Sequence, residues 1–145
     1  MPIVRDVLAE KGQDVHSISP DSSVLEATRV MNQHRIGALV VLQDRKLVGI
    51  FTERDVLTRV VGTANNIADL RVADVMTRDV LTATPDTDLA DVSELMRERR
   101  IRHVPICDEH GHLHGMVSIG DVNAAFARER ERQLHQLSEY VYGRA

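Results

Sequence analysis

The sequence predicts an α+β fold in which two β-α-β-β-α repeats, related by a pseudo-twofold axis, pack sheet to sheet and precede a C-terminal helical extension. Two observations predict this fold. Residues 19–42 (SPDSSVLEATRVMNQHRIGALVVL) align without gaps with residues 84–107 (TPDTDLADVSELMRERRIRHVPIC). After a one-residue insertion near Gly111, residues 47–56 (LVGIFTERDV) align with residues 113–122 (LHGMVSIGDV). A repeat of this size cannot bury its helix and sheet faces alone, so the two copies are expected to pack together.

The same alignment divides the chain into four parts. DVL at 6–8 resembles DVM at 74–76, and EKGQ supplies extra residues in the first copy. The polar stretch GTANNIADLR between the copies is typical of a linker with a short helical turn at most. We therefore expect a first repeat over residues 1–61, a linker over 62–71, a second repeat over 72–127 and the extension over 128–145.

The first long helix of each repeat is predicted from a capping pattern followed by an apolar face. Ser23 and Glu26 form the pattern of a capping box, and Asp88 with Asp91 is a weaker version of it. Apolar residues then recur at helical spacing, which places them on one buried face with both methionines in the core. These residues are Val24, Ala27, Val30 and Met31 in the first copy, and Leu89, Val92, Leu95 and Met96 in the second.

Two strands are predicted to follow each of these helices, because short apolar runs flank a polar turn. ALVVL and LVGIF flank QDRK, and HVPIC and LHGMVS flank DEHGH, where Gly111 suits a turn position with positive φ. Pro105 removes one backbone donor, so it is expected at a strand end or at a sheet edge. Cys107, in the run VPIC, is predicted to be a small buried hydrophobe rather than a reactive thiol.

The second helix of each repeat is expected to begin after Thr52 or Ser118 and to hold an Asp in its first turn. In the second copy this helix continues into the extension. The run ARERERQ predicts a solvated face with ion pairs four residues apart. The stripe formed by Leu134, Leu137 and Val141 predicts a packing or dimer surface.

Composition excludes several classes of protein. With 145 residues, 43% of them hydrophobic and 28% charged, the chain can bury a core. A net charge of -4 with no basic stripe argues against nucleic-acid binding. No apolar run approaches the roughly 20 residues that span a bilayer, and the N-terminus lacks the features of a signal peptide. A single cysteine allows no intramolecular disulfide, so a cytoplasmic protein is expected.

No pattern of an active site is found, so neither an enzyme nor a catalytic cofactor is expected. The sequence has no Gly-rich phosphate loop of the P-loop or Rossmann type, and no His paired with a nucleophile in a known context. HGHLH, with His110, His112 and His114, has two interpretations, a metal site or a polar hairpin tip. We favour the hairpin tip, because no Cys or carboxylate set with zinc spacing accompanies the three histidines.

Both repeats together resemble a pair of CBS domains, the Bateman module, and the chain looks like the stand-alone bacterial CBS-pair proteins. PDSSVLEATRVMNQHRIGALVV with GIFTERD, and PDTDLADVSELMRERRIRHVPI with GMVSIGD, carry the resemblance over Val4 to Ala127. The resemblance implies that the clefts between the domains bind adenosine-containing ligands, such as AMP, ADP, ATP, NAD or S-adenosylmethionine. It also implies a homodimer and a regulated partner protein.

The residues after each third strand suit a nucleotide. A hydroxyl and backbone N–H groups at a helix start favour a phosphate, and an Asp one turn later lies within reach of a ribose diol. The resemblance makes Asp55 and Asp121 ribose ligands and places the hydroxyls of Thr52 and Ser118 beside the phosphate. Alternatively, these residues are ordinary helix caps, and the two roles are compatible.

The resemblance also completes each cleft with residues of the opposite copy. Arg54 is expected to contact a phosphate, and Gly120 stands at the equivalent place in the second copy. The cleft of Asp55 would include Thr77, Val80, Arg102 and His103. The cleft of Asp121 would include Lys11, Gly12, Val15, Gly37 and Ala38. Because the cleft of Asp55 is the more cationic, we expect it to favour the more highly phosphorylated ligand. The cleft of Asp121, with Lys11 as its nearby cation and small residues at Gly37 and Ala38, is expected to suit a bulkier or less charged group.

The resulting hypothesis is a regulatory sensor that binds an adenine nucleotide and changes how it meets a partner. A ligand that bridges the two copies would favour one relative packing of them, by a shift of population. The alternative from another class is a structural dimerisation module whose clefts bind no nucleotide.

Overall fold

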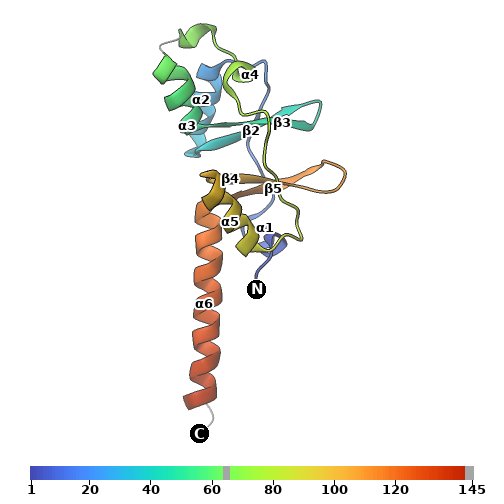
Figure 1. The fold of residues 1–145 in the computed structure, drawn as a ribbon, viewed down its shortest axis with the longest axis vertical. Helices are drawn as coiled ribbons and strands as arrows, with labels where there is room; N and C mark the ends of the chain where they lie inside the picture. The colour runs from blue at the N-terminus through green and yellow to red at the C-terminus, as the bar shows by residue number, and fades with distance from the viewer. Residues whose placement is uncertain (64–65, 143–145) are drawn as a thin grey trace.

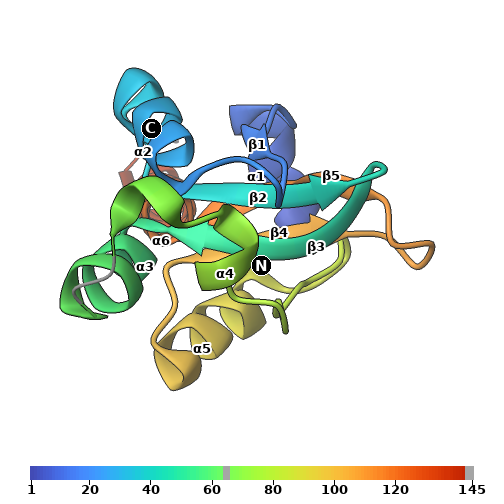
Figure 2. The same cartoon turned by 90° about the horizontal axis from the view of Figure 1, so that it is seen from above.

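The computed structural model, whose described residues are 1–63 and 66–142, is an α+β fold with two repeats and a long C-terminal helix, as the sequence predicts (Figure 1). The sheets of the two repeats lie against each other in the middle of the molecule, with the helices outside (Figures 1 and 2). The elements of the first half are α1 (Val4–Lys11), β1 (Ser17–Ile18), α2 (Val24–His34), β2 (Ala38–Gln43), β3 (Lys46–Thr52), α3 (Glu53–Asp55), the π-helical η1 (Val56–Val60) and the 3₁₀ segment η2 (Val61–Thr63). Those of the second half are η3 (Ile67–Asp69), α4 (Val72–Val75), α5 (Leu89–Arg99), β4 (His103–Cys107), β5 (Leu113–Ser118) and α6 (Ile119–Tyr142).

Two hydrophobic cores form, and each takes a helix from outside its own repeat. The core of the second repeat includes Val4, Val7 and Leu8 of α1, the helix that begins the first repeat in the chain. The core of the first repeat includes Val72 and Val75 of α4. The leading helices are therefore exchanged between the repeats, and this packing crosses the divisions at residues 61 and 72 that the sequence alone indicates.

Backbone hydrogen bonds fix the exchange at both ends of the molecule. The N–H groups of Val4 and Arg5 donate to the carbonyls of Thr87 and Pro85 at 2.9 and 2.8 Å. In the same way, the N–H groups of Val72 and Ala73 donate to the carbonyls of Ser22 and Pro20 at 2.9 Å each. The two sets of bonds are equivalent under the internal repeat, so the exchange is a symmetric feature of the fold.

The first strand is not equally formed in the two repeats, which corrects the expectation of a strand in both. In the first repeat β1, β2 and β3 form a three-stranded sheet, with β1 parallel to β2. In the second repeat β4 and β5 form a two-stranded sheet, and only Ala83 bridges to Ile106.

Pro105 explains this difference. The N–H of Val40 in β2 donates to the carbonyl of His16 at 3.3 Å. Pro105 stands at the equivalent place in β4 and has no N–H, so the parallel ladder cannot extend beyond Ala83. Pro105 lies in the middle of β4 rather than at its end, on the edge away from β5, where its carbonyl accepts from the Ala83 N–H at 3.1 Å.

The predicted helix starts are confirmed in position, and one of the two predicted caps is wrong. The Ser23 hydroxyl accepts from the Glu26 N–H at 3.0 Å and begins α2. Asp88 precedes α5, but its side chain forms no cap hydrogen bond. The backbone of Asp88 instead bridges to Ile3, in the segment that leads into α1. This strand-like pairing holds the start of α5 without a side-chain cap.

The predicted helix faces and turns are observed, except that Val30 and Leu95 are half-buried. Met31, Met96 and Cys107 are buried, and burial raises the pKa of the Cys107 thiol. Gly111 has φ 80, as its predicted place in a turn requires, and η3 is the only helical segment that the structure describes in the linker after Thr63. Residues 64 and 65 of the linker and 143–145 of the extension lie outside the described residues.

The second half of α6 stands away from the rest of the molecule (Figure 1). Every side chain from Glu131 to Tyr142 is exposed, including Leu134, Leu137 and Val141 at 59%, 59% and 57%. The ion pair that the structure describes in the run ARERERQ joins Arg132 to Glu129, three residues apart rather than the predicted four. None of the described helices combines the length and the apolar character needed to cross a membrane.

We predict that Leu8→Ala will lower the free energy of unfolding by about 2–4 kcal/mol, because it leaves a cavity in the core of the second repeat. Leu8 is 3% exposed, and one of its methyl groups lies against Gly115 of β5. Chemical denaturation of the full chain measures the change. Leu25→Ala on α2 is the matched control, because Leu25 is 37% exposed and should cost less than about 1 kcal/mol. Equal losses in the two variants would contradict the exchanged position of α1.

Candidate functional site

A pocket of about 540 Å³ lies between the two repeats at the end of β3, and we call it the Asp55 pocket. Residues of both repeats line it, which follows from the sheet-to-sheet packing. All seven residues that the sequence places in the cleft of Asp55 are among the lining residues: Thr52, Arg54, Asp55, Thr77, Val80, Arg102 and His103. The residues that the repeat alignment and the family resemblance indicate therefore lie together around one pocket. The role of these residues in binding a ligand stays a proposal.

Asp55 is held in place by the start of its own helix. Its Oδ2 accepts from the Thr52 N–H at 2.9 Å and from the Thr52 hydroxyl at 3.2 Å. The hydroxyl in turn accepts from the Asp55 N–H at 3.3 Å, which completes a capping box. Asp55 is 6% exposed and is the one charged residue among the buried residues of the described chain. The cap interpretation of this pair is therefore correct, and it leaves Oδ1 directed away from the Thr52 contacts.

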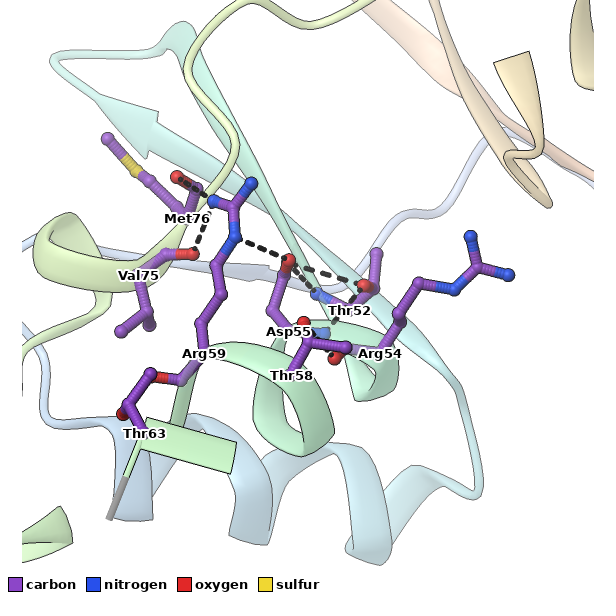
Figure 3. A network of polar contacts seen from close by, with 8 residues as sticks. All are labelled: Thr52, Arg54, Asp55, Thr58, Arg59, Thr63, Val75 and Met76. Atoms are coloured by element: carbon purple, nitrogen blue, oxygen red, sulfur yellow. Dashed lines mark hydrogen bonds and ion pairs between the residues drawn. The ribbon is translucent and has the colours of Figure 1, made fainter. Parts of the chain in front are cut away.

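Arg59 is a residue of this site that the sequence analysis missed. Its Nε lies 3.7 Å from Asp55 Oδ1, and its guanidinium donates to the carbonyls of Val75 and Met76 at 3.0 and 3.1 Å (Figure 3). Arg59 thus connects Asp55 to the end of α4, the helix exchanged into this repeat. Its spacing of four residues from Asp55 was a usable indication, since such pairs share a helix face.

Arg54 joins the two repeats directly. Its guanidinium donates at 2.6 Å to the carbonyl of Arg100, the left-handed residue that ends α5. The predicted phosphate contact of Arg54 would therefore begin from a side chain that already spans the cleft.

The Asp55 pocket carries more positive than negative charge. Five arginines line it, against three carboxylates. The arginines are Arg54, Arg59, Arg99, Arg100 and Arg102, and the carboxylates are Glu53, Asp55 and Asp79. The sequence analysis also missed Glu53. Its carboxylate lies close to Gly37, because a Cβ added at Gly37 would be 3.0 Å from Glu53 Oε1. The surplus of guanidinium groups suits a ligand with one or more phosphates.

His103 lies at the start of β4, between the two predicted ligand sites, the Asp55 pocket and the site around Asp121, which we call the two corners. Burial is the largest influence on it and lowers the pKa of the imidazole below its ordinary value. The carboxylates of Glu53 and Asp121 oppose this shift, and the cations of Lys11 and Arg102 add to it. His103 is therefore influenced by charges from both corners.

The second predicted site has different contacts, and we call Lys11, Ser118 and Asp121 together the Asp121 corner. Asp121 Oδ2 accepts from the Ser118 N–H at 2.8 Å and from Lys11 Nζ at 2.6 Å. Burial alone would raise the pKa of Asp121, but the hydrogen bonds from Lys11 and Ser118 hold it below its ordinary value.

The other residues predicted for the cleft of Asp121 are placed less uniformly. Gly12 follows α1 with φ 94, Val15 is half-buried in the next segment, and Gly120 is exposed in the first turn of α6. Gly37 lines the Asp55 pocket, to which the sequence analysis did not assign it. Ala38 is buried and pairs with Thr52 across β2 and β3.

The histidine-rich turn is organised by a carboxylate. Asp108 accepts from the N–H groups of His110 and His112 at 2.8 and 3.0 Å, and it contacts His114 Nε2 at 2.8 Å. The hydrogen bond from His114 is the largest influence and holds the pKa of Asp108 well below its usual range. No group of three or more candidate metal ligands is found among the described residues.

Comparison with known proteins identifies the repeats. The family model of the CBS domain matches residues 4–62 and 72–128. The chain belongs to the CBS domain family. A CBS domain-containing mitochondrial protein of Arabidopsis thaliana, CBSX3, is 36% identical over 149 residues, which cover 97% of this chain and 72% of that protein.

Solved structures agree with this assignment. The CBS-domain containing protein ATU1752 of Agrobacterium tumefaciens superposes with a TM-score of 0.81 at 39% identity, over 86% of this chain and 98% of that one. The CBS domain pair of the protein MJ0100, in complex with 5′-methylthioadenosine and S-adenosyl-L-methionine, superposes with a TM-score of 0.73 at 26% identity, over 86% and 99% of the two chains. The two repeats of this chain are accordingly its first and second CBS domains.

We predict that acid will destabilise the folded chain through His103. Because the pKa of His103 is lowered in the folded state, the unfolded chain binds the proton first, from about pH 6.5 downward. The free energy of unfolding should therefore fall as the pH drops below about 6.5, and His103→Gln should reduce this dependence. Denaturant titrations between about pH 5 and 8 measure it.

His135→Gln on the exposed part of α6 is the control for this experiment. It removes an imidazole that lies outside both corners, and it should keep the pH profile of the wild type. A wild-type profile in His103→Gln would show that burial of His103 does not oppose its protonation.

Proposed function

We propose that this chain is a regulatory module that binds an adenosine-containing ligand in the Asp55 pocket. The observation that carries the proposal is a pocket of about 540 Å³, lined by both CBS domains, that combines the Thr52–Asp55 pair with five arginines. Its volume lies in the range of roughly 300–1,000 Å³ common for small-molecule sites. Carboxylate and guanidinium groups in one pocket complement a ribose diol and a phosphate, respectively.

The ligand that this pocket suits best is a phosphorylated one, such as AMP, ADP, ATP or NAD. Asp55 would accept hydrogen bonds from the ribose, and Arg102 with Arg54 would contact phosphate oxygens. The related CBS pair of MJ0100 holds two adenosine derivatives, which supports adenosine as the common part of the ligand. The five arginines support the phosphate.

The regulatory step would be a change in how the two CBS domains pack. The pocket is lined by both domains, and the Arg54–Arg100 contact crosses between them. A ligand that engages both sides stabilises one relative arrangement, and its effect is limited to its difference in affinity between the two states. The proposal contains binding and no chemical step, and a cytoplasmic location stays a prediction. Formation of product from ATP or NAD would contradict the absence of a chemical step.

The second half of α6 would hold a second copy of the chain, so the module would be a homodimer. An isolated helix of about 12 residues is marginal in water, and this one exposes a stripe at the spacing of a coiled coil. In an antiparallel pair, Leu134 meets Leu137 of the other copy and Arg130 meets Val141. A parallel pair would bring two Arg130 guanidinium groups together, so self-association favours the antiparallel arrangement.

We predict that Asp55→Asn will weaken binding of AMP and ATP by at least about tenfold, because it removes a charged acceptor for the ribose hydroxyls. Arg102→Gln, in the second CBS domain, should weaken ATP binding by a similar factor, because Arg102 lines the same pocket. Isothermal titration calorimetry measures both affinities.

Two further measurements separate a lost contact from a lost fold. Asp44→Asn, in the exposed turn between β2 and β3, removes one carboxylate outside the pocket and should bind as the wild type does. Thermal melting without ligand should show that Asp55→Asn is folded. Absence of any heat with AMP, ATP and NAD in the wild type would favour the structural dimerisation module over the sensor.

We predict that Leu137→Glu will convert the dimer into a monomer, because it places a carboxylate in the middle of the apolar stripe. Sedimentation velocity of the full chain at tens of micromolar measures the mass. Gln136→Glu adds the same charge one position away on the opposite face of the helix, and it should stay dimeric. A wild type that sediments as a monomer, or a Leu137→Glu variant that stays dimeric, would contradict the proposed pairing.

A further inference from the structure

Lys11 crosses from the N-terminal helix into the second CBS domain and contacts the carboxylate that corresponds to Asp55. It is the last residue of α1, and its Nζ lies 2.6 Å from Asp121 Oδ2 and 2.8 Å from the carbonyl oxygen of Met116. The side chains of Lys11 and Asp121 are 35% and 22% exposed. A partly buried pair of this kind is less screened by salt than an ion pair on an open surface.

In the first CBS domain, different groups make the contacts at the equivalent position. Ile50, the equivalent of Met116, pairs its backbone with Thr77 through hydrogen bonds of 2.9 and 3.0 Å. The cation nearest to Asp55 is Arg59, at 3.7 Å, and Ala125 stands at its equivalent place in the second domain. The first domain therefore uses two groups, the Thr77 N–H for the strand carbonyl and Arg59 for the carboxylate. In the second domain the ammonium group of Lys11 makes both contacts.

The hydrogen bonds of Asp121 limit what a ligand can do at this corner. Oδ2 already accepts from the Ser118 N–H at 2.8 Å and from Lys11 Nζ, and a carboxylate oxygen offers two lone pairs. A ribose diol that uses both carboxylate oxygens must therefore displace Lys11 from Oδ2. The displaced ammonium keeps the Met116 carbonyl but loses its anionic partner, and an uncompensated charge in a partly buried site is unfavourable.

We infer that Lys11 determines the specificity of the Asp121 corner, admitting adenosine compounds that carry a phosphate and disfavouring uncharged ones. A phosphate oxygen accepts the displaced ammonium in a charge-assisted hydrogen bond, whereas adenosine alone offers no such acceptor. The inference rests on the proposed function, since it concerns a second site for the same class of ligand. It also assigns the two corners different selectors, arginines at the Asp55 pocket and one lysine at the Asp121 corner.

The test is a ¹⁵N NMR titration of the full chain with AMP and with adenosine. The Ser118 amide reports on the Asp121 corner and the Thr52 amide on the Asp55 pocket, because each donates to the carboxylate of its own site. In Lys11→Met, AMP should bind more weakly at Ser118 and adenosine more tightly. The preference for AMP over adenosine should therefore fall by about tenfold or more.

Two controls accompany this variant. Lys11→Arg keeps the positive charge and should keep the preference for AMP. Lys46→Met removes the chain's other lysine, which is exposed at the start of β3, and should leave both affinities unchanged. A titration of the Asp121 carboxyl carbon should show its pKa rise in Lys11→Met, which reports on the contact without any ligand.

The possible failures are distinguishable. An unchanged preference at Ser118 in Lys11→Met, or ligand responses at Thr52 with none at Ser118, would overturn the inference and leave the proposed function intact. No response of either amide to AMP or adenosine would overturn the proposed function and this inference together.

Discussion

The exchange of leading helices between the two CBS domains is the constraint on which the rest of the structure depends. Each domain completes its core with the helix that begins the other domain in the chain, α1 for the second and α4 for the first. Because apolar residues such as Leu8 and Val72 have no other core available, the two domains cannot separate without exposing them. Backbone bonds from Val4 to Thr87 and from Val72 to Ser22 fix both exchanges in the same geometry.

The exchange also creates the places where a ligand could bind. The segment after α4 brings Thr77 against Ile50, and the end of α1 brings Lys11 against Met116. These two residues contact equivalent strand positions, but Thr77 contributes its backbone and Lys11 its ammonium group. The duplicated fold therefore produces two similar corners, and the segments that enter them decide how the corners differ.

Charge then separates the two corners further. The Asp55 pocket gathers arginines from α3, η1, the end of α5 and the segment before β4, so its positive charge comes from both domains. The Asp121 corner has Lys11 as its close cation, already paired with the carboxylate. His103 lies between them, and charged groups of both influence its pKa. A change of charge at the Asp121 corner therefore changes the pKa of a group that lines the Asp55 pocket.

The sequence by itself determined the duplicated architecture, the buried faces of α2 and α5, and the starts of both second helices. These features depend on residues within a few positions of one another, such as Ser23 with Glu26 or Thr52 with Asp55, and their periodicity is visible in one dimension. Seven of the residues that line the Asp55 pocket were indicated by the family resemblance, which implies which segments face each other. Only the tertiary structure decided the exchange of α1 and α4, the bridge of Arg59 to α4, the shortened ladder at Pro105 and the pairing of Lys11 with Asp121. Each of these joins groups far apart in the chain or depends on the register between segments, and neither local propensity nor spacing specifies such a contact.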